Sequence, residues 1–104
     1  MSVKIENGAK VKGNARILDS AWLRGRVVVQ DNAIVCDNAM VFGFAKVYGN
    51  ARVSGKAMVY GKAKIYGNAH VYGHAKVRDN AFLEGDVIIT KGWIFDVHWW
   101  RNVP

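Results

Sequence analysis

The stretch VFGFAKVYGNARVSGKAM, residues 41–58, contains three hexads of one pattern. Each hexad begins with valine and has glycine at its third position and alanine at its fifth. The same spacing extends in both directions, from Ile5 to Ile88. All fourteen first positions are branched aliphatics, and all twelve alanines of the chain lie at fifth positions. A repeat this regular decides the fold.

The hexad predicts a strand followed by a turn. In residues 45–48, alanine and valine face inward and their neighbours face outward, as in a strand with period two. Third positions are Gly, Asp or Asn, and the fourth is Asn in six hexads, so these two residues predict a turn in which one takes positive φ. Three strands and three turns make a triangular coil of 18 residues. Parallel hydrogen bonds stack such coils about 4.8 Å apart.

This period resembles that of the hexapeptide-repeat, left-handed parallel β-helix family, over residues 5–88. The resemblance implies an all-β, left-handed triangular solenoid of about five coils. The family includes acyltransferases, γ-type carbonic anhydrases and simpler repeat proteins. Its enzymes often carry Gly at the second hexad position, whereas the third-position Gly seen here looks like the loop-free repeat proteins of bacterial and phage accessory genomes.

The repeat decays near the end of the chain, which predicts a β-helix domain over 1–92 and an aromatic tail over 93–104. Ile89 still fits a first position, but Trp93 falls where alanine is expected, so we expect the coil to open there. A parallel solenoid needs a cap over its last coil. Trp99 and Trp100 belong to that cap or dock onto a neighbouring subunit or partner.

Outward residues 18 apart are expected to stack on three faces. The first face carries an apolar patch, flanked by Arg24, over three coils: Trp22, Met40, Phe42, Met58 and Tyr60. Monomeric proteins rarely expose such a patch. Because members of the family commonly assemble as trimers with their prisms side by side, we expect a homo-oligomer. A site for a different protein and ordinary exposure are the alternatives.

The second face alternates basic and aromatic residues: Lys46, Tyr48, Lys64 and Tyr66. Such a surface holds a nucleic-acid backbone while its rings stack on bases. The alternative is a solubilising lysine column with tyrosines chosen for strand propensity. At one corner, asparagines recur every 18 residues and predict an amide ladder with a structural role: Asn14, Asn32, Asn50 and Asn68.

Catalysis is not expected. No loop interrupts residues 5–88, and the acyltransferases of the family need a protruding loop. His70 and His74 lie four apart, one on a strand and one on a turn, and the three-histidine zinc motif implied by the carbonic anhydrases is absent. We therefore expect no metal and no cofactor.

The composition indicates which partners and which cellular compartment to expect. The chain has 104 residues, enough for one domain, and a net charge of +7 that favours anionic partners. It has no run of about 18 apolar residues and no visible secretory leader, so no membrane association is expected. A single cysteine, Cys36, favours a reducing compartment, and we expect the cytoplasm.

Three functions remain open. The leading hypothesis is a non-catalytic, homo-oligomeric, trimeric binding or scaffold protein, which by resemblance suits a small phage or mobile-element factor that inhibits or sequesters a host component. The second is an anion-binding module for nucleotides or nucleic acid. The third is a minimal acyltransferase that uses His70 or His74.

Overall fold

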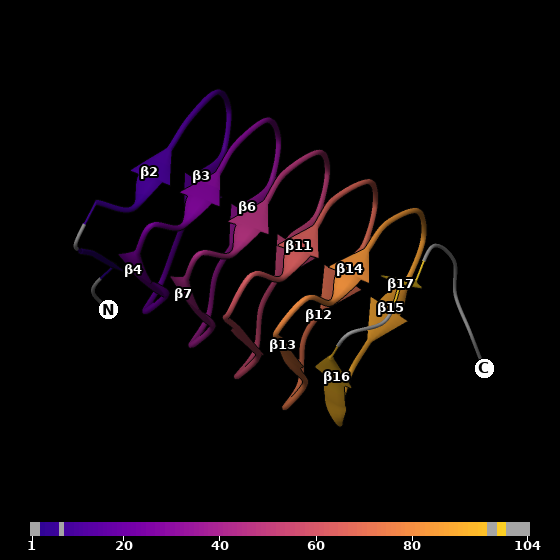
Figure 1. Cartoon of the computed structure of the whole chain (residues 1–104). Coiled ribbons are helices and arrows are strands. Elements are labelled where there is room, and N and C mark those ends of the chain that lie inside the picture. The colour runs from indigo at the N-terminus through magenta and orange to yellow at the C-terminus, as the bar shows by residue number, and fades with distance from the viewer. Residues whose placement is uncertain (1–2, 7, 96–97, 100–104) are drawn as a thin grey trace.

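The chain winds into a stack of coils in the computed structural model, which describes residues 3–6, 8–95 and 98–99 (Figure 1). All regular elements among these residues are strands, which form three parallel sheets. Sheet A contains β1 (Lys4–Ile5), β4 (Trp22–Gly25), β7 (Met40–Gly43), β10 (Met58–Val59), β13 (Lys76–Arg78) and β16 (Trp93–Phe95). Sheet B contains β2 (Lys10–Val11), β5 (Val28–Val29), β8 (Lys46–Val47), β11 (Lys64–Ile65), β14 (Phe82–Leu83) and β17 (His98–Trp99). Sheet C contains β3 (Arg16–Ile17), β6 (Ile34–Val35), β9 (Arg52–Val53), β12 (His70–Val71) and β15 (Ile88–Ile89).

The register confirms a parallel β-solenoid of about five coils with 18 residues in each. Met40 pairs with Met58, Lys46 with Lys64, and Arg52 with His70. The strands are shorter than the four residues expected, and only β4 and β7 reach that length. Hydrogen bonding nevertheless continues around the corners, where Asn50 N donates to Gly67 O at 2.7 Å. Among the described residues no helix is present that could cross a membrane.

The interior is a stack of alanine and aliphatic ladders. From Ala21 to Val87, every residue at a first or fifth hexad position is at most 1% exposed. The first coil has a neighbour on one side only, and its Ile5 and Val11 are 47% and 38% exposed. The predicted inward face is therefore confirmed along the central coils.

From Gly13 to Gly85, positive φ falls on the third hexad position of each turn, whereas Gly8 and Gly92, near the two ends of the stack, take positive φ at the fourth position. At the third position it is taken by glycine or by aspartate, as at Asp31 and Asp37, and not by the asparagine that follows. Gly67 shows why glycine is favoured, because a Cβ there would lie 2.6 Å from Gly85 N. Aspartate is held by a compensating bond: Gly55 N donates to Asp37 Oδ2 at 3.0 Å.

The amide ladder is confirmed at the corner between sheets B and C. Each Nδ2 donates to the Oδ1 of the asparagine one coil later, at 3.2–3.3 Å, in the series Asn14, Asn32, Asn50 and Asn68. The series ends with Asn68 donating to Asp86 Oδ1 at 3.3 Å. The predicted structural role of these asparagines thus has a direct geometric basis.

The coil does not open at Trp93, so that expectation was wrong. Trp93 pairs with the outward residue Lys76, and Ile94 takes the inward position opposite Val77. The step from Val77 to Ile94 is 17 residues, so the chain omits one corner residue and avoids placing Trp93 at an alanine position. Ile94 packs against the core. Strand pairing continues past residue 92 into β17, where Trp99 is opposite Leu83. Trp100 lies outside the described residues.

Replacement of Ala57 by leucine tests the packing of the ladder. Ala57 is fully buried at 0% exposure, and its partners one coil away are Ala39 and Ala75, also at 0%. We expect Ala57→Leu to lower the free energy of unfolding by about 1–3 kcal/mol through overpacking. Urea titration measures the change. Lys56→Leu, at the adjacent exposed turn position, is the control and should change stability by no more than about 0.5 kcal/mol. An Ala57→Leu variant as stable as wild type contradicts the crowded corner.

Candidate functional site

The corner between sheets A and B lacks the amide ladder found at the corner between sheets B and C. Its fourth hexad positions are Gly8, Arg26, Phe44, Lys62 and Asn80 in successive coils. The backbone of this corner is nevertheless regular, because Arg26 N donates to Gly43 O at 2.7 Å and Phe44 N donates to Gly61 O at 2.8 Å. The solenoid therefore displays large side chains here on a turn whose backbone is the same as at the other corners.

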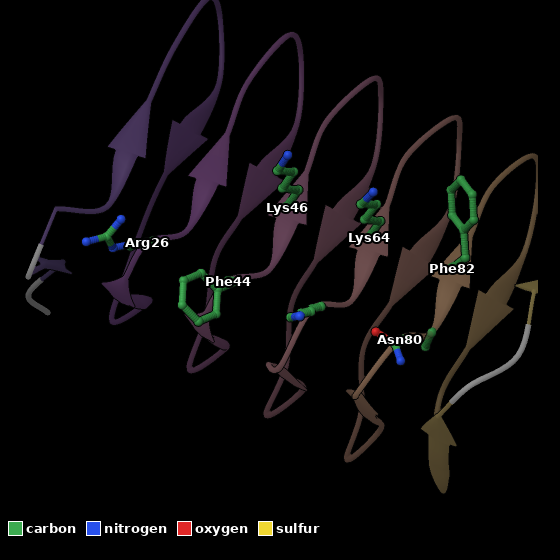
Figure 2. Close-up of a pocket in the computed structure, with 8 residues that line it drawn as sticks. Arg26, Phe44, Lys46, Lys64, Asn80 and Phe82 are labelled. Carbon is green, nitrogen blue, oxygen red and sulfur yellow. The ribbon is translucent and has the colours of Figure 1, made fainter.

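A groove of about 450 Å³ runs beside this corner (Figure 2). We call it the basic groove, and it is lined by Arg26, Phe44, Lys46, Lys62, Lys64, Asn80, Ala81 and Phe82. Figure 2 shows the labelled side chains in two rows that follow the stack of coils, Arg26, Phe44 and Asn80 in one and Lys46, Lys64 and Phe82 in the other. Four of the eight lining residues are cations and none is acidic.

Two smaller hollows extend the basic groove over sheet B. One, of about 330 Å³, shares Arg26 and includes Lys10. The other, of about 280 Å³, shares Lys46 and Lys64 and includes Lys12. Six cations thus line one connected side of the solenoid, which a linear anion can follow across several coils.

The electrostatics of the basic groove are unbalanced. Among the described residues, no carboxylate lies within ion-pair distance of its four cations. The ion pair between Arg78 Nε and Asp79 Oδ2, at 3.4 Å, involves no residue of the groove lining. Lys46 and Lys64 are register partners in adjacent coils. Like charges directly opposite each other in a sheet destabilise it. An anion bound between them would remove this repulsion.

Aromatic rings accompany the cations. Phe44 is 56% exposed, the highest value for a large hydrophobic side chain among the described residues. On sheet B, Tyr48 and Tyr66 stack with centroids 4.8 Å apart, and Tyr66 meets Phe82 at 5.0 Å. The rings of Tyr48 and Tyr66 already cover one another, so Phe44 offers the more open ring face.

One carboxylate, Glu84, occupies an outward strand position of sheet B among the described residues. Tyr66 donates a hydrogen bond to Glu84 Oε1 at 2.6 Å, and this bond, with burial second, raises the pKa of Tyr66 to about 12. Burial, followed by the charges of Glu84 and Asp31, raises the pKa of Tyr48. Both phenols therefore stay neutral at physiological pH and add no negative charge beside the lysines.

Sheet A carries the predicted apolar patch, which we call the apolar face: Trp22, Met40, Phe42, Met58 and Tyr60. All five residues are half-buried by their neighbours on the sheet. Phe42 and Tyr60 stack in parallel with centroids 4.9 Å apart. The ring of Trp22, in contrast, lies beneath two cations, Lys4 and Arg24, at 5.2 and 5.6 Å from its centroid. The apolar part of the face is thus centred on β7 and β10.

Among the described residues, the histidines and the cysteine outside the basic groove form no comparable site. His70 lies on β12 of sheet C and pairs with Arg52 and Ile88, away from the basic groove. The possible ligand atoms of Asp19, Cys36 and Asp37 lie within 4.8 Å of one another. Both carboxylates there already serve turns, since Asp19 Oδ2 accepts from Asp37 N and Asp37 Oδ2 accepts from Gly55 N. Burial raises the pKa of the Cys36 thiol, and the negative charges of Asp37 and Asp19 raise it further. The thiol is therefore protonated at neutral pH.

The structure places the predicted residues in the columns expected. Lys46 and Lys64 line the basic groove, while Tyr48 and Tyr66 form the neighbouring column on sheet B. The sequence pattern alone did not single out the other six lining residues: Arg26, Phe44, Lys62, Asn80, Ala81 and Phe82. The signal for three of them, Arg26, Phe44 and Lys62, was the fourth hexad position, where each replaces the asparagine found at the corner between sheets B and C.

Comparison with known proteins supports a β-solenoid repeat. The YdcK β-solenoid repeat matches residues 45–61, about one coil that includes Lys46 and Tyr48 on sheet B and Met58 and Tyr60 on sheet A. No curated protein and no solved structure matches the chain. The chain is therefore similar to repeat proteins of the β-solenoid kind, and its ligand must be argued from its own surface.

Replacement of Glu84 by glutamine tests the electrostatics of sheet B. The carboxylate stabilises the protonated phenol of Tyr66, so its removal should lower the pKa of Tyr66 from about 12 toward the usual value of about 10. Ultraviolet titration of tyrosinate in wild type, Glu84→Gln and Tyr66→Phe measures the change and assigns it. Identical titration curves for wild type and Glu84→Gln would contradict the hydrogen bond.

Proposed function

We propose that this chain is a non-catalytic β-solenoid binding protein whose basic groove takes a phosphate-bearing anion. The observation that carries this proposal is the set of four cations that line one groove without a carboxylate: Arg26, Lys46, Lys62 and Lys64. Phosphate groups bind to lysine and arginine mainly through charge, and several such contacts on one chain add affinity. The ladder of coils spaces the cations regularly, which suits a ligand with repeated anionic groups.

The lining of the basic groove favours binding over chemistry. It contains no histidine, serine, cysteine or carboxylate to act as a general base or nucleophile, and its three lysines are exposed to solvent. His70, the strand histidine of the acyltransferase hypothesis, lies on sheet C. These positions support a binding protein more than an acyltransferase.

Charge reversal in the basic groove tests the proposal. The double substitution Lys46→Glu and Lys64→Glu should weaken binding of short-chain inorganic polyphosphate at least tenfold, because each change removes a cation and adds a repulsive charge. Wild-type affinity should also fall steeply as salt is raised. Fluorescence anisotropy with labelled polyphosphate measures both effects.

Lys56→Glu is the matched control, because Lys56 is an exposed turn lysine at the corner between sheets C and A. Its charge change equals that of either single groove substitution, Lys46→Glu or Lys64→Glu, which should each weaken binding, whereas Lys56→Glu should retain most of the affinity. Absence of polyphosphate binding by wild type, or equal losses in the control and the groove variants, would contradict the proposal.

Self-assembly through the apolar face is the second part of the proposed function. Met40 and Met58 are register partners on adjacent strands, and Phe42 and Tyr60 stack beside them. Apolar patches that extend over neighbouring strands mark interfaces between proteins. We propose that this face joins copies of the chain, with a trimer as the expected assembly and a different protein partner as the alternative.

Met40→Lys tests this assembly. The side chain of Met40 points away from the core, so a lysine there should leave the solenoid folded. It would bury a charge in the interface between copies, where the desolvation of the ammonium group is unfavourable. We expect the oligomer to dissociate, as measured by light scattering, with an unchanged circular dichroism spectrum. Ile34→Lys, on the outer side of sheet C, should keep the wild-type mass. A Met40→Lys variant of wild-type mass would exclude the apolar face as a self-interface.

A further inference from the structure

We infer that the ligand of the basic groove is a single-stranded nucleic acid, laid along the stack of coils with an unpaired base against Phe44. This inference rests on the proposed anion binding and names its substrate class. It is carried by the position of Phe44 within the cation rows, since a ligand made of phosphate alone has no use for an exposed ring there.

Phe44 has no evident structural role at its position. It occupies a turn position that takes an asparagine, with inter-coil hydrogen bonds, at the corner between sheets B and C. Its side chain is 56% exposed, although the fold would be served by a small or polar residue. An exposed aromatic ring at a site that the fold does not constrain is typical of a binding residue.

The surroundings of Phe44 suit a nucleotide chain. Arg26 and Lys62 occupy the same turn position one coil before and one coil after it, about 4.8 Å away along the stack. Lys46 follows two residues later in the other row of Figure 2. A base stacked on the ring would therefore have a cation on both sides along the groove and a third across it, where its flanking phosphates would lie.

The far end of the basic groove repeats this combination. Phe82 follows Lys64 in the same column of sheet B, as its register partner one coil later. Asn80 lines the groove beside it and offers an amide that can both donate to and accept from the edge of a base. Cations, rings and one amide thus alternate along the groove, as on surfaces that bind single strands.

An unpaired strand fits these features better than other polyanions do. In a duplex the bases stack on each other and are paired, so Phe44 would find no free base face. An acidic peptide or an anionic lipid surface would use the lysines and the arginine but offers no base to stack on Phe44 or to hydrogen-bond with the amide of Asn80. The ring stacks on any base, so we expect little sequence preference.

Binding of labelled single-stranded oligothymidylate tests the inference. Wild type should bind the single strand more tightly than a blunt duplex of equal length. Phe44→Leu should weaken binding of the single strand about tenfold, the range expected for one stacked base, and leave polyphosphate binding unchanged. Phe44→Trp should restore the affinity. Because Phe44 is exposed, these variants should fold.

Tyr72→Leu is the matched control, because Tyr72 is an exposed aromatic residue at 41% on sheet C, away from the basic groove. It should not alter binding. In Lys64→Gln, the slope of log affinity against log salt should become less steep by about 0.7 for the single strand.

The outcomes separate this inference from the proposed function. Two results would overturn the inference and leave anion binding in place. In the first, wild type binds polyphosphate but does not prefer the single strand to the duplex. In the second, Phe44→Leu does not weaken binding of the single strand. Tighter binding of polyglutamate or phosphatidylserine vesicles than of the single strand also overturns it. If wild type binds none of these anions, both the inference and the proposed function are overturned.

Discussion

Hydrogen bonds between backbone groups one coil apart are the constraint on which the rest of this molecule depends. Lys10 N donates to Val27 O at 2.8 Å, and Lys64 N donates to Ala81 O at 2.9 Å, in the same pattern on successive coils. Up to Ile89, this pairing places each strand residue directly above its counterpart 18 positions away. Residues at equivalent positions of successive coils therefore form columns along the solenoid. The side chains within a column contact one another, so they must be compatible with that contact. Alanine and valine tolerate it inside the coil, and amides tolerate it at the corner between sheets B and C, where each asparagine donates to the next.

The same constraint confines function to a small number of positions. The inward residues fill a narrow interior, and a side chain at Gly67 would meet the backbone of Gly85, so neither the interior nor the third hexad position can vary freely. Only outward strand residues and the fourth position remain. At the corner between sheets A and B, the fourth position carries Phe44 and Lys62 where an amide would be compatible with the fold. Lysines stacked at Lys46 and Lys64 are another departure, because they repel each other without helping the sheet. Both departures lie on one groove, which is the reason to assign the function there.

Sequence reasoning predicted the architecture, the coil length and the membership of the three faces, because a period of six admits few packings for alternating alanine and valine. Its expectation of a left-handed coil rested on resemblance alone. It failed at Trp93, because it assumed that the hexad would keep its length, whereas the chain omits a corner residue and brings Ile94 inward instead. The basic groove was only half predicted. Lys46 and Lys64 stood out as outward residues, but Arg26 and Phe44 were assigned to turns and given no further role. Their role becomes apparent only from the structure, in which this corner column and the neighbouring column of sheet B line one hollow.

The apolar face and the basic groove are neighbours on the chain, and this closeness links assembly to binding. Phe42 lies on the apolar face and Phe44 in the groove, two residues apart on either side of Gly43. Copies joined through the apolar face would each keep a groove at the rim of the shared interface, since the groove begins where sheet A ends. A linear ligand long enough to reach a second groove would then bind the assembly with a higher effective concentration than it has for one copy. Weak contacts from a few lysines and one ring would suffice in each copy, which is consistent with a groove that is open and built from surface side chains rather than a deep pocket.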